Sequence, residues 1–360
     1  MLFGTARLTV LKTICRSHPR PHTRSFASSR PPRADRAVIY SENGDPSEVL
    51  NVLTFPDLPP PGSDSVTIQF LLSPINPADI NVIEGVYPSK PIKTGALASS
   101  GKGSEEEPVF IGGNEGLAQV TAVGSSVSSL KINDWVVVTK QQHGTWSTRK
   151  NVAVTDVALI PDAHKLDEAQ AATITASVNP PSAYNMLNDF VRLEKGDWVV
   201  QNGANSAVGQ AVIQIAAAHG LKTINLIRNR ENVELLKSQL GQLGATHVLT
   251  YDDLLDKSIR GKVKEWTGGK DIKLGLNCVG GKDTTLMSRL LGQDAHLVSY
   301  GAMSKQPLSL PTSLFIFKNL TCHGFWQRRW YADKTPQQRD TLMRTIVNML
   351  ADGQVHYCSK

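Results

Sequence analysis

Short runs of apolar and β-branched residues alternate with turn residues through the first part of the chain. These runs cover residues 37–40, 48–55, 65–72, 116–124 and 134–139. Strands of this length with no long helical pattern between them are typical of a β-barrel or β-sandwich domain. We therefore predict that the chain from Ala37 to about Pro161 forms a β-rich domain.

The pattern changes after about Ser177, where apolar residues begin to recur at helical spacing between short strands. A helix is predicted at 208–219, which stops at Gly220, a residue favoured just past a helix C-terminus. Strands are predicted at 197–201, 223–227, 246–250, 274–279 and 296–300, with a second helix at 231–240. Strands that alternate with helices predict a parallel, doubly wound sheet.

One segment inside the β-rich part, Thr94–Pro108, has a different composition. It is rich in Gly, Ser and Glu. Because such a segment buries little apolar surface, we expect a mobile surface loop.

The formal charge of +6 is unevenly distributed along the 360 residues. Residues 1–34 contain seven Lys or Arg and no acid, which leaves 31 basic against 32 acidic residues from Asp35 onward. The body of the protein is therefore nearly neutral, and its charge does not indicate a nucleic-acid partner. No apolar run reaches the length of about 18 residues that a membrane span needs.

The basic segment 1–34 is rich in Arg and Ser, and its apolar residues from Phe3 to Ile14 share one helical face. These features predict a mitochondrial transit peptide. A disordered basic tail that binds anionic surfaces is the alternative. The four cysteines contain no C-x-x-C pair, so neither a zinc ribbon nor a disulfide framework is expected. A reducing compartment such as the mitochondrial matrix agrees with this cysteine usage.

The turn Gly203–Gly209 lies between a predicted strand and a predicted helix. A dinucleotide pyrophosphate binds to helix N-terminal amides at such a turn, which here contains Asn205, Ser206, Ala207 and Val208. Ala207 replaces the central Gly of the full G-x-G-x-x-G pattern. Small residues in a tight strand-to-helix turn also occur without a ligand.

The next predicted strand ends in Arg228, Asn229 and Arg230. A domain specific for NAD places Asp or Glu there to bind the ribose 2′-hydroxyl, whereas Arg suits the 2′-phosphate of NADPH. The sequence therefore favours NADPH as the cofactor. The alternative is a solvated strand end with charges that flank the helix.

Several runs together resemble the mitochondrial 2-enoyl thioester reductases, also called enoyl-[acyl-carrier-protein] reductases. These form a zinc-free, quinone oxidoreductase-like family of the medium-chain dehydrogenase/reductase superfamily. The runs, which lie between about residue 37 and the end of the chain, are Ser73–Asn81, Gly112–Gly116, Val200–Ile215, Leu276–Gly281, Tyr300–Met303 and Gly324–Trp326.

The resemblance implies an α/β fold with a GroES-like β-rich catalytic domain and a Rossmann nucleotide-binding domain that contains a doubly wound parallel sheet. The expected division is a transit peptide at 1–34, the catalytic domain at 35–177 with a closing segment at 327–360, and the NADP-binding domain at 178–326. The family continues beyond a helix at 336–351 and supplies a late Lys to the cofactor phosphate. We therefore expect this chain to be less stable and to bind NADPH more weakly than its relatives.

The resemblance also implies the roles of individual residues. Tyr87 matches the family's proton donor, and a phenol with an ordinary pKa near 10 is protonated at pH 7 and can donate. A loop tyrosine that packs on the barrel is the alternative. The implied cofactor contacts include Asn179 near the nicotinamide. They also include the turn residues Asn205–Val208 at the pyrophosphate and Arg228–Arg230 at the 2′-phosphate. Two further segments complete the set: Tyr300, Gly301, Ala302 and Met303, and then Phe325, Trp326, Gln327 and Arg328. Trp326 could equally pack between domains.

No metal is expected in this protein. Zinc-dependent members of the superfamily carry a G-H-E motif, but the matching residues here are Gly113, Asn114 and Glu115. A catalytic zinc normally needs three protein ligands, and no Cys lies near Asn76–Asp79.

The implied activity is NADPH-dependent reduction of trans-2-enoyl thioesters, carried on acyl carrier protein or CoA, in mitochondrial fatty acid synthesis. The resemblance also implies a homodimer. Arg328 and Arg329 are candidates for a basic patch that faces an acidic carrier protein. The alternatives are an NADPH quinone oxidoreductase-like enzyme and a truncated, inactive homologue.

Overall fold

The computed structural model describes residues 34–98, 100–167, 170–171 and 178–356. The chain separates into the units Met1–Ala34 and Asp35–Lys360, and only the second is described below. The expected transit peptide therefore lies outside the described residues, apart from Ala34. The same holds for Cys15 and Cys358.

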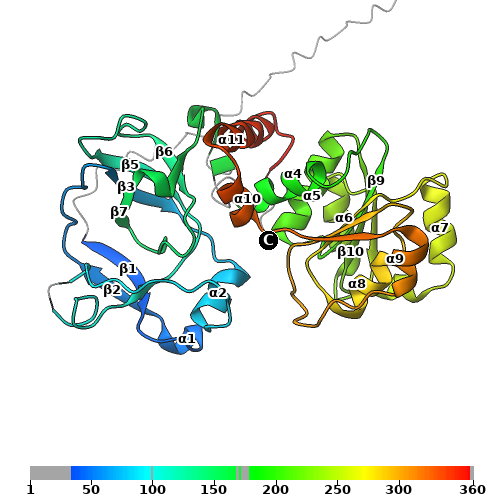
Figure 1. The fold of residues 1–360 in the computed structure, drawn as a ribbon, viewed down its shortest axis with the longest axis horizontal. Coiled ribbons are helices and arrows are strands. Elements are labelled where there is room, and N and C mark those ends of the chain that lie inside the picture. Colours follow the sequence, from blue (N-terminus) through cyan, green and yellow to red (C-terminus); the bar gives the residue numbers. More distant parts are fainter. Residues whose placement is uncertain (1–33, 99, 168–169, 172–177, 357–360) are drawn as a thin grey trace, which may run out of the picture. The chain divides into compact units, whose positions relative to one another are not determined.

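The β-rich part contains two antiparallel sheets (Figure 1). The first has the order β2–β1–β4, with β1 at Asp35–Tyr40, β2 at Asn51–Phe55 and β4 at Phe110–Ile111. The second has the order β7–β3–β5–β6–β8, formed by β3 (Ser65–Leu72), β5 (Leu117–Val123), β6 (Trp135–Val138), β7 (Arg149–Ala153) and β8 (Val157–Leu159). The prediction of a β-rich region is confirmed. Strands β7 and β8 were not predicted from the sequence.

The predicted strand at 48–55 begins too early. Residues Pro46–Val49 form the one-turn helix α1, and β2 begins only at Asn51. Asp45 caps α1, since its side chain accepts a hydrogen bond from the N–H of Ser47 at 2.8 Å, and Pro46 favours the first helical turn. Local capping therefore overrides the β-propensity of the apolar residues that follow.

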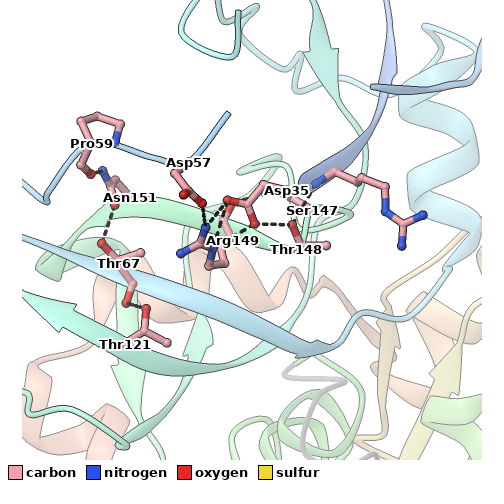
Figure 2. Close-up of polar contacts among 10 residues, drawn as sticks. Asp35, Asp57, Pro59, Thr67, Thr121, Ser147, Thr148, Arg149 and Asn151 are labelled. Atoms are coloured by element: carbon pink, nitrogen blue, oxygen red, sulfur yellow. Dashed lines mark hydrogen bonds and ion pairs between the residues drawn. The ribbon is translucent and has the colours of Figure 1, made fainter. Parts of the chain in front are cut away.

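Long-range polar contacts join the strands of the β-rich part (Figure 2). The carboxylate of Asp35 is 2% exposed and accepts hydrogen bonds from Thr148 at 2.8 Å and from the Arg149 guanidinium at 2.6 Å. Arg149 also pairs with Asp57 at 2.6 Å. In the same region Thr67 donates to the side-chain oxygen of Asn151 at 2.7 Å. These contacts connect segments that lie about a hundred residues apart in the sequence.

The second part contains a six-stranded sheet with all neighbours parallel, in the order β11–β10–β9–β12–β13–β14. Its strands are β9 (Trp198–Asn202), β10 (Lys222–Ile227), β11 (His247–Thr250), β12 (Leu274–Asn277), β13 (His296–Ser299) and β14 (Thr321–Gly324). The helices of this part are α5 (Ala207–Ala218), α6 (Val233–Gln242), α7 (Ile259–Trp266), α8 (Gly281–Ser288) and α9 (Thr312–Lys318). The doubly wound α/β prediction is confirmed, and β14 is an additional edge strand.

Three further helices, α4 (Asn179–Asn188), α10 (Gln327–Asp333) and α11 (Pro336–Ala351), share a core with both parts. On α11, the buried side chains of Leu342, Ile346 and Leu350 belong to this core. The same cluster contains Leu117 of β5 and Val212 of α5. Helix α11 therefore contributes to the hydrophobic core that the two parts share.

The composition of Thr94–Pro108 predicts a mobile surface loop, but part of this segment is buried. Leu97 is 9% exposed and belongs to a cluster with Ile39 and Val109, and Ser104 is 2% exposed. Thr94 forms an isolated β-bridge with Val109. Few apolar residues are needed here, because the Leu97 side chain packs against the first sheet while backbone hydrogen bonds within the segment and to Val109 hold its shape.

Candidate functional site

The predicted pyrophosphate turn follows β9 and leads into α5. Ser206 is the N-cap of α5, and its hydroxyl accepts a hydrogen bond from the N–H of Gly209 at 3.1 Å. Ala207 and Val208 form the first turn of the helix, while Asn205 and Ser206 are half-buried just before it. Amides at such a helix N-terminus favour an anion, so the geometry suits a phosphate group.

Two glycines make this turn possible. Gly203 has φ +60°, and a Cβ there would lie 2.4 Å from the Cys278 sulfur. A Cβ on Gly209 would lie 2.6 Å from the carbonyl oxygen of Ala204. The N–H of Gly203 donates to the hydroxyl of Tyr251 at 3.1 Å, and burial raises the pKa of Tyr251 to about 12. The turn is thus shaped by close packing that any side chain would disturb.

The residues predicted to bind a 2′-phosphate follow β10 and are exposed. They are Arg228, Asn229 and Arg230, and Asn229 donates to the Asp252 carboxylate at 2.9 Å. Two exposed guanidiniums at the carboxyl end of the strand next to β9 can reach a ligand phosphate. The two arginines therefore lie where the sequence predicts them, at the end of the second strand of the sheet.

The loop after β13 lies next to the pyrophosphate turn through Cys278. The N–H of Met303 donates to the carbonyl of Cys278 at 2.9 Å, and a Cβ on Gly301 would lie 3.1 Å from the same carbonyl oxygen. Burial raises the pKa of Tyr300 well above its usual value. Ala302 and Met303 are exposed, so this loop offers both backbone and side chains to a ligand.

The segment after β14 contains the last group of predicted cofactor residues. Phe325 packs near Phe190, whereas Trp326 is 45% exposed and has the Arg328 guanidinium 5.6 Å from its ring centre. Trp326 is therefore not a buried core residue between the two parts. Gln327 is buried, and its side-chain oxygen accepts a hydrogen bond from Asn185 of α4 at 3.2 Å.

Arg328 reaches the loop that carries Tyr87. Its guanidinium donates to the Ser89 hydroxyl at 3.0 Å and to the side-chain oxygen of Gln141 at 3.1 Å. Arg329 instead pairs with Asp333 on its own helix at 3.5 Å. Of the two arginines considered for a carrier-protein patch, Arg328 therefore already has partners in the β-rich part, one of them in the loop that carries Tyr87.

Tyr87 is half-buried in the loop after helix α2 (Pro77–Ile83). The backbone N–H groups of Val86 and Tyr87 donate to the carbonyl of Asn81 at 2.9 and 3.1 Å. Gln142 donates to the carbonyl of Ser89, which holds the same loop from the other side. The position of Tyr87 is thus set by α2, by Gln142 and by Arg328.

Two buried polar residues at the N-terminal end of α2 were not predicted as site residues. Glu115 is 3% exposed and accepts hydrogen bonds from the Asn76 side chain and from the N–H of Val178, both at 2.6 Å. Asn179, the predicted nicotinamide contact, is the next residue and begins α4. The sequence contained a signal that could have pointed to Asn76 and Glu115, because each is a polar residue within one of the runs that resemble the reductase family.

Asp79 is the second buried carboxyl group of this region. It is 3% exposed and accepts a hydrogen bond from the N–H of Asn76 at 2.7 Å. Burial raises the pKa of Asp79 to about 6, although hydrogen bonds from Asn76 and Asn114 oppose the shift. Asp79 therefore titrates closer to neutrality than an exposed Asp.

The residues that replace the zinc motif have other partners. The side-chain oxygen of Asn114 accepts the N–H of Gln142 at 2.5 Å, and both oxygens of Glu115 accept hydrogen bonds. Among the described residues, no group of three or more His, Cys, Asp or Glu could hold a metal ion. No helix among them is long and apolar enough to cross a membrane.

Comparisons with known proteins agree with this arrangement. A family model described as zinc-binding dehydrogenase matches residues 207–346. The mitochondrial enoyl-[acyl-carrier-protein] reductase of Yarrowia lipolytica is 46% identical over 87% of this chain and 78% of its own length. The human protein of the same name is 41% identical, over 93% of this chain and 84% of its own.

Solved structures give the same result. The mitochondrial 2-enoyl thioester reductase Etr1p/Etr2p heterodimer from Candida tropicalis has a TM-score of 0.82 at 39% identity, over 91% of each chain. A structure of Etr1p with NADP and crotonyl-CoA also has a TM-score of 0.82, at 38% identity over 90% of each chain. The quinone oxidoreductase of Escherichia coli with NADPH has a TM-score of 0.71 over 90% of each chain, and at 20% identity it supports only the fold.

A parallel sheet with a glycine-containing strand-to-helix turn after β9, joined to a β-rich part in which Asn114 takes the place of the zinc motif's His, defines a zinc-free medium-chain dehydrogenase/reductase. The identity to curated relatives over most of the chain is more specific. The chain belongs to the family of mitochondrial enoyl-[acyl-carrier-protein] reductases.

Proposed function

We propose that this protein uses NADPH to reduce the carbon–carbon double bond of trans-2-enoyl thioesters in mitochondrial fatty acid synthesis. The observation that carries the proposal is the contact of Arg328 with Ser89 at 3.0 Å. This contact brings the loop of Tyr87 to the segment that follows β14, at the carboxyl edge of the nucleotide-binding sheet. A proton donor and a nucleotide site therefore belong to one site.

The residues of the parallel sheet fit NADPH. The first turn of α5 would bind the pyrophosphate, and Arg228 and Arg230 would bind the 2′-phosphate. Asn179 would contact the nicotinamide side, and the loops at Tyr300–Met303 and Phe325–Arg328 would close around the cofactor. When bound, NADPH supplies a hydride to C3 of the enoyl thioester.

Tyr87 provides the proton in the proposed reaction. Reduction at C3 leaves an enolate-like anion, and the Tyr87 hydroxyl protonates C2 to give the saturated acyl thioester. Hydrogen bonds that involve Asn81, Gln142 and Arg328 fix the backbone of the loop that carries Tyr87. A fixed donor reduces the entropy lost on reaching the transition state.

The test is the Tyr87→Phe variant, assayed with crotonyl-CoA and NADPH. We expect kcat to fall by about 100-fold or more, while the Kd for NADPH changes little, because only the proton donor is lost. Tyr184→Phe on α4, which removes a hydroxyl outside the site, is the matched control. Normal turnover by Tyr87→Phe would remove the proton-donor assignment.

Two assays separate the remaining alternatives. A quinone oxidoreductase would reduce a quinone faster than crotonyl-CoA, so both substrates are compared with the same preparation. An inactive homologue would fail to bind cofactor, which a fluorescence titration of the full chain with NADPH detects. Acyl carrier protein and CoA thioesters of equal chain length then identify the preferred carrier.

The proposal includes the organisation and location of the chain. We assign residues 35–177 and 327–360 to the catalytic domain, 178–326 to the NADP-binding domain, and 1–34 to a transit peptide for the mitochondrial matrix. The mitochondrial names of the relatives support this assignment. Import of the full chain into isolated mitochondria, followed by N-terminal sequencing, tests it.

A homodimer formed through the parallel sheet is also proposed. Strand β14 is at the edge of the sheet, and nearby α9 exposes Phe315, Ile316 and Phe317, the last at 75%. Exposed apolar side chains beside a free sheet edge are typical of an interface. Light scattering should give the mass of a dimer, and Phe317→Glu should shift the mass to that of a monomer.

A further inference from the structure

Glu115 connects two segments that the proposed reaction uses. Its two carboxylate oxygens accept separate hydrogen bonds, one from the Asn76 side-chain amide and one from the backbone N–H of Val178, each at 2.6 Å. The residue is 3% exposed, so water competes little for these contacts. Charge-assisted hydrogen bonds of this length are strong in a buried site.

Each end of this connection continues to a group that acts in the reaction. Asn76 is the N-cap residue of α2 and forms a capping box with Asp79. At the other end of α2, the carbonyl of Asn81 accepts the N–H of Tyr87 at 3.1 Å. Val178 precedes Asn179, the proposed nicotinamide contact, at the start of α4.

The backbone of Glu115 is held by the β-rich part. The Thr145 hydroxyl donates to the backbone carbonyl of Glu115 at 2.8 Å, and the carbonyl of Thr145 accepts the Ser73 hydroxyl at 2.8 Å. The Trp146 indole donates to the carbonyl of Pro74 at 3.1 Å. Neighbouring residues thus hold both Glu115 and the segment that leads to Asn76.

We propose that Glu115 is a positioning residue for the reduction, whose carboxylate sets the helix that carries the Tyr87 loop against the segment of Asn179. This inference rests on the proposed function. This role requires a side chain with two acceptor oxygens, because both the Asn76 amide and the Val178 N–H donate. A glutamine in this position would present one oxygen and one NH2 group, so one of the two contacts would face a second donor.

The test uses Glu115→Gln, Asn76→Asp and the double variant, with crotonyl-CoA and NADPH as substrates. We expect Glu115→Gln to lower kcat about 10- to 100-fold, because small displacements of a proton donor have effects of this size. The Kd for NADPH should change less than about threefold, since the pyrophosphate turn is untouched. The solvent deuterium isotope effect on kcat should rise, as proton transfer becomes slower.

The double variant should restore activity. An aspartate at position 76 accepts from the new glutamine NH2 group and keeps an oxygen to cap α2, while the glutamine oxygen still accepts the N–H of Val178. Asn76→Asp alone places two carboxylates together and should lower kcat. The exposed Glu48→Gln is the matched control and should leave kcat unchanged.

Wild-type kcat in Glu115→Gln would overturn the inference. So would a loss of kcat that follows a loss of thermal stability with no change in the solvent isotope effect, or a double variant no more active than Glu115→Gln. If the wild-type chain itself does not reduce crotonyl-CoA, the proposed function fails and this inference fails with it.

Discussion

The turn after β9 in the parallel sheet and the β-rich part, which carries Tyr87, are built in different ways. The first uses local backbone geometry: Gly203, Ser206 and Gly209 lie within seven residues and shape one turn. The second uses side chains from distant segments, such as Glu115 with Asn76 and Asp35 with Arg149. A nucleotide phosphate can bind to amides of one turn, whereas a proton donor must be placed by tertiary contacts.

This difference predicts how each region responds to change. In the turn, the addition of one methyl group should cause the largest loss of stability, because the neighbouring backbone atoms cannot move away. In the β-rich part, the loss of one partner should do most harm, because it leaves a buried charge without compensation.

Gly209→Ala should cause the largest loss of stability. A Cβ at this position would lie 2.6 Å from the oxygen and 2.7 Å from two carbons of Ala204, so the backbone of the turn must shift. We expect a loss of about 3–4 kcal/mol in unfolding free energy and much weaker NADPH binding. Denaturant unfolding and an NADPH titration measure the two effects.

Gly241→Ala is the matched control for this change. Gly241 is in α6, and a Cβ there meets nothing within 4 Å. The unfolding free energy of this variant should increase by about 0.5–1 kcal/mol, since alanine favours a helix. Equal effects of the two alanines would contradict the packing argument.

Arg149→Met should destabilise the β-rich part by about 2–3 kcal/mol. It leaves the buried Asp35 carboxylate without its cation, although Thr148 still donates to it. Arg344→Met removes an exposed pair with Asp340 and should leave the unfolding free energy almost unchanged, because solvent screens exposed charges. Similar losses in the two variants would mean that burial does not decide the effect.

His143 should make the β-rich part sensitive to acid. Burial, reinforced by Lys150, lowers the pKa of His143 to about 4. The unfolded chain then binds the proton first, so this group's contribution to stability is lost as the pH falls from about 6.5 toward 4. Removal of this group by His143→Gln should reduce the stability lost between pH 7 and 4.5 by about 2 kcal/mol.

Asp79 changes the pH dependence of stability in the opposite direction to His143, so the contributions of the two groups must be separated. Its raised pKa of about 6 means that the folded state binds the proton more tightly, so its contribution to stability increases as the pH falls from about 6 to 4. Unfolding curves of the wild type and His143→Gln at several pH values isolate the histidine. Parallel pH profiles for the two proteins would contradict the assignment.

Arg228→Ala should have the smallest effect. We expect the Kd for NADPH to rise about tenfold and the Kd for NADH to stay unchanged, because only NADPH carries the 2′-phosphate. Arg260→Ala, an exposed arginine on α7, is the control for a general loss of charge. An equal loss of affinity for both cofactors would mean that Arg228 does not read the phosphate.

The elements of the parallel sheet were predictable because their signals are local. Strands β9 to β13 and the helices α5 and α6 were all predicted within a few residues of their observed bounds. Two errors fall where tertiary contacts decide: Leu97 buries part of a segment that is predicted to be a surface loop, and β14 becomes a strand only by pairing with β13. The early start predicted for β2 is a different error, because the cap at Asp45 is local. Hydrophobic periodicity does not carry such information.

Four features could be predicted without the structure: the doubly wound sheet, the turn of small residues before α5, the cations after β10, and the resemblance that points to Tyr87. Two contacts became visible only in the folded chain: Glu115 bridges Asn76 and Val178, and Arg328 contacts the Tyr87 loop. The physical reason is the range of the interactions. A turn depends on residues next to one another, whereas these hydrogen bonds join residues between 39 and 239 positions apart.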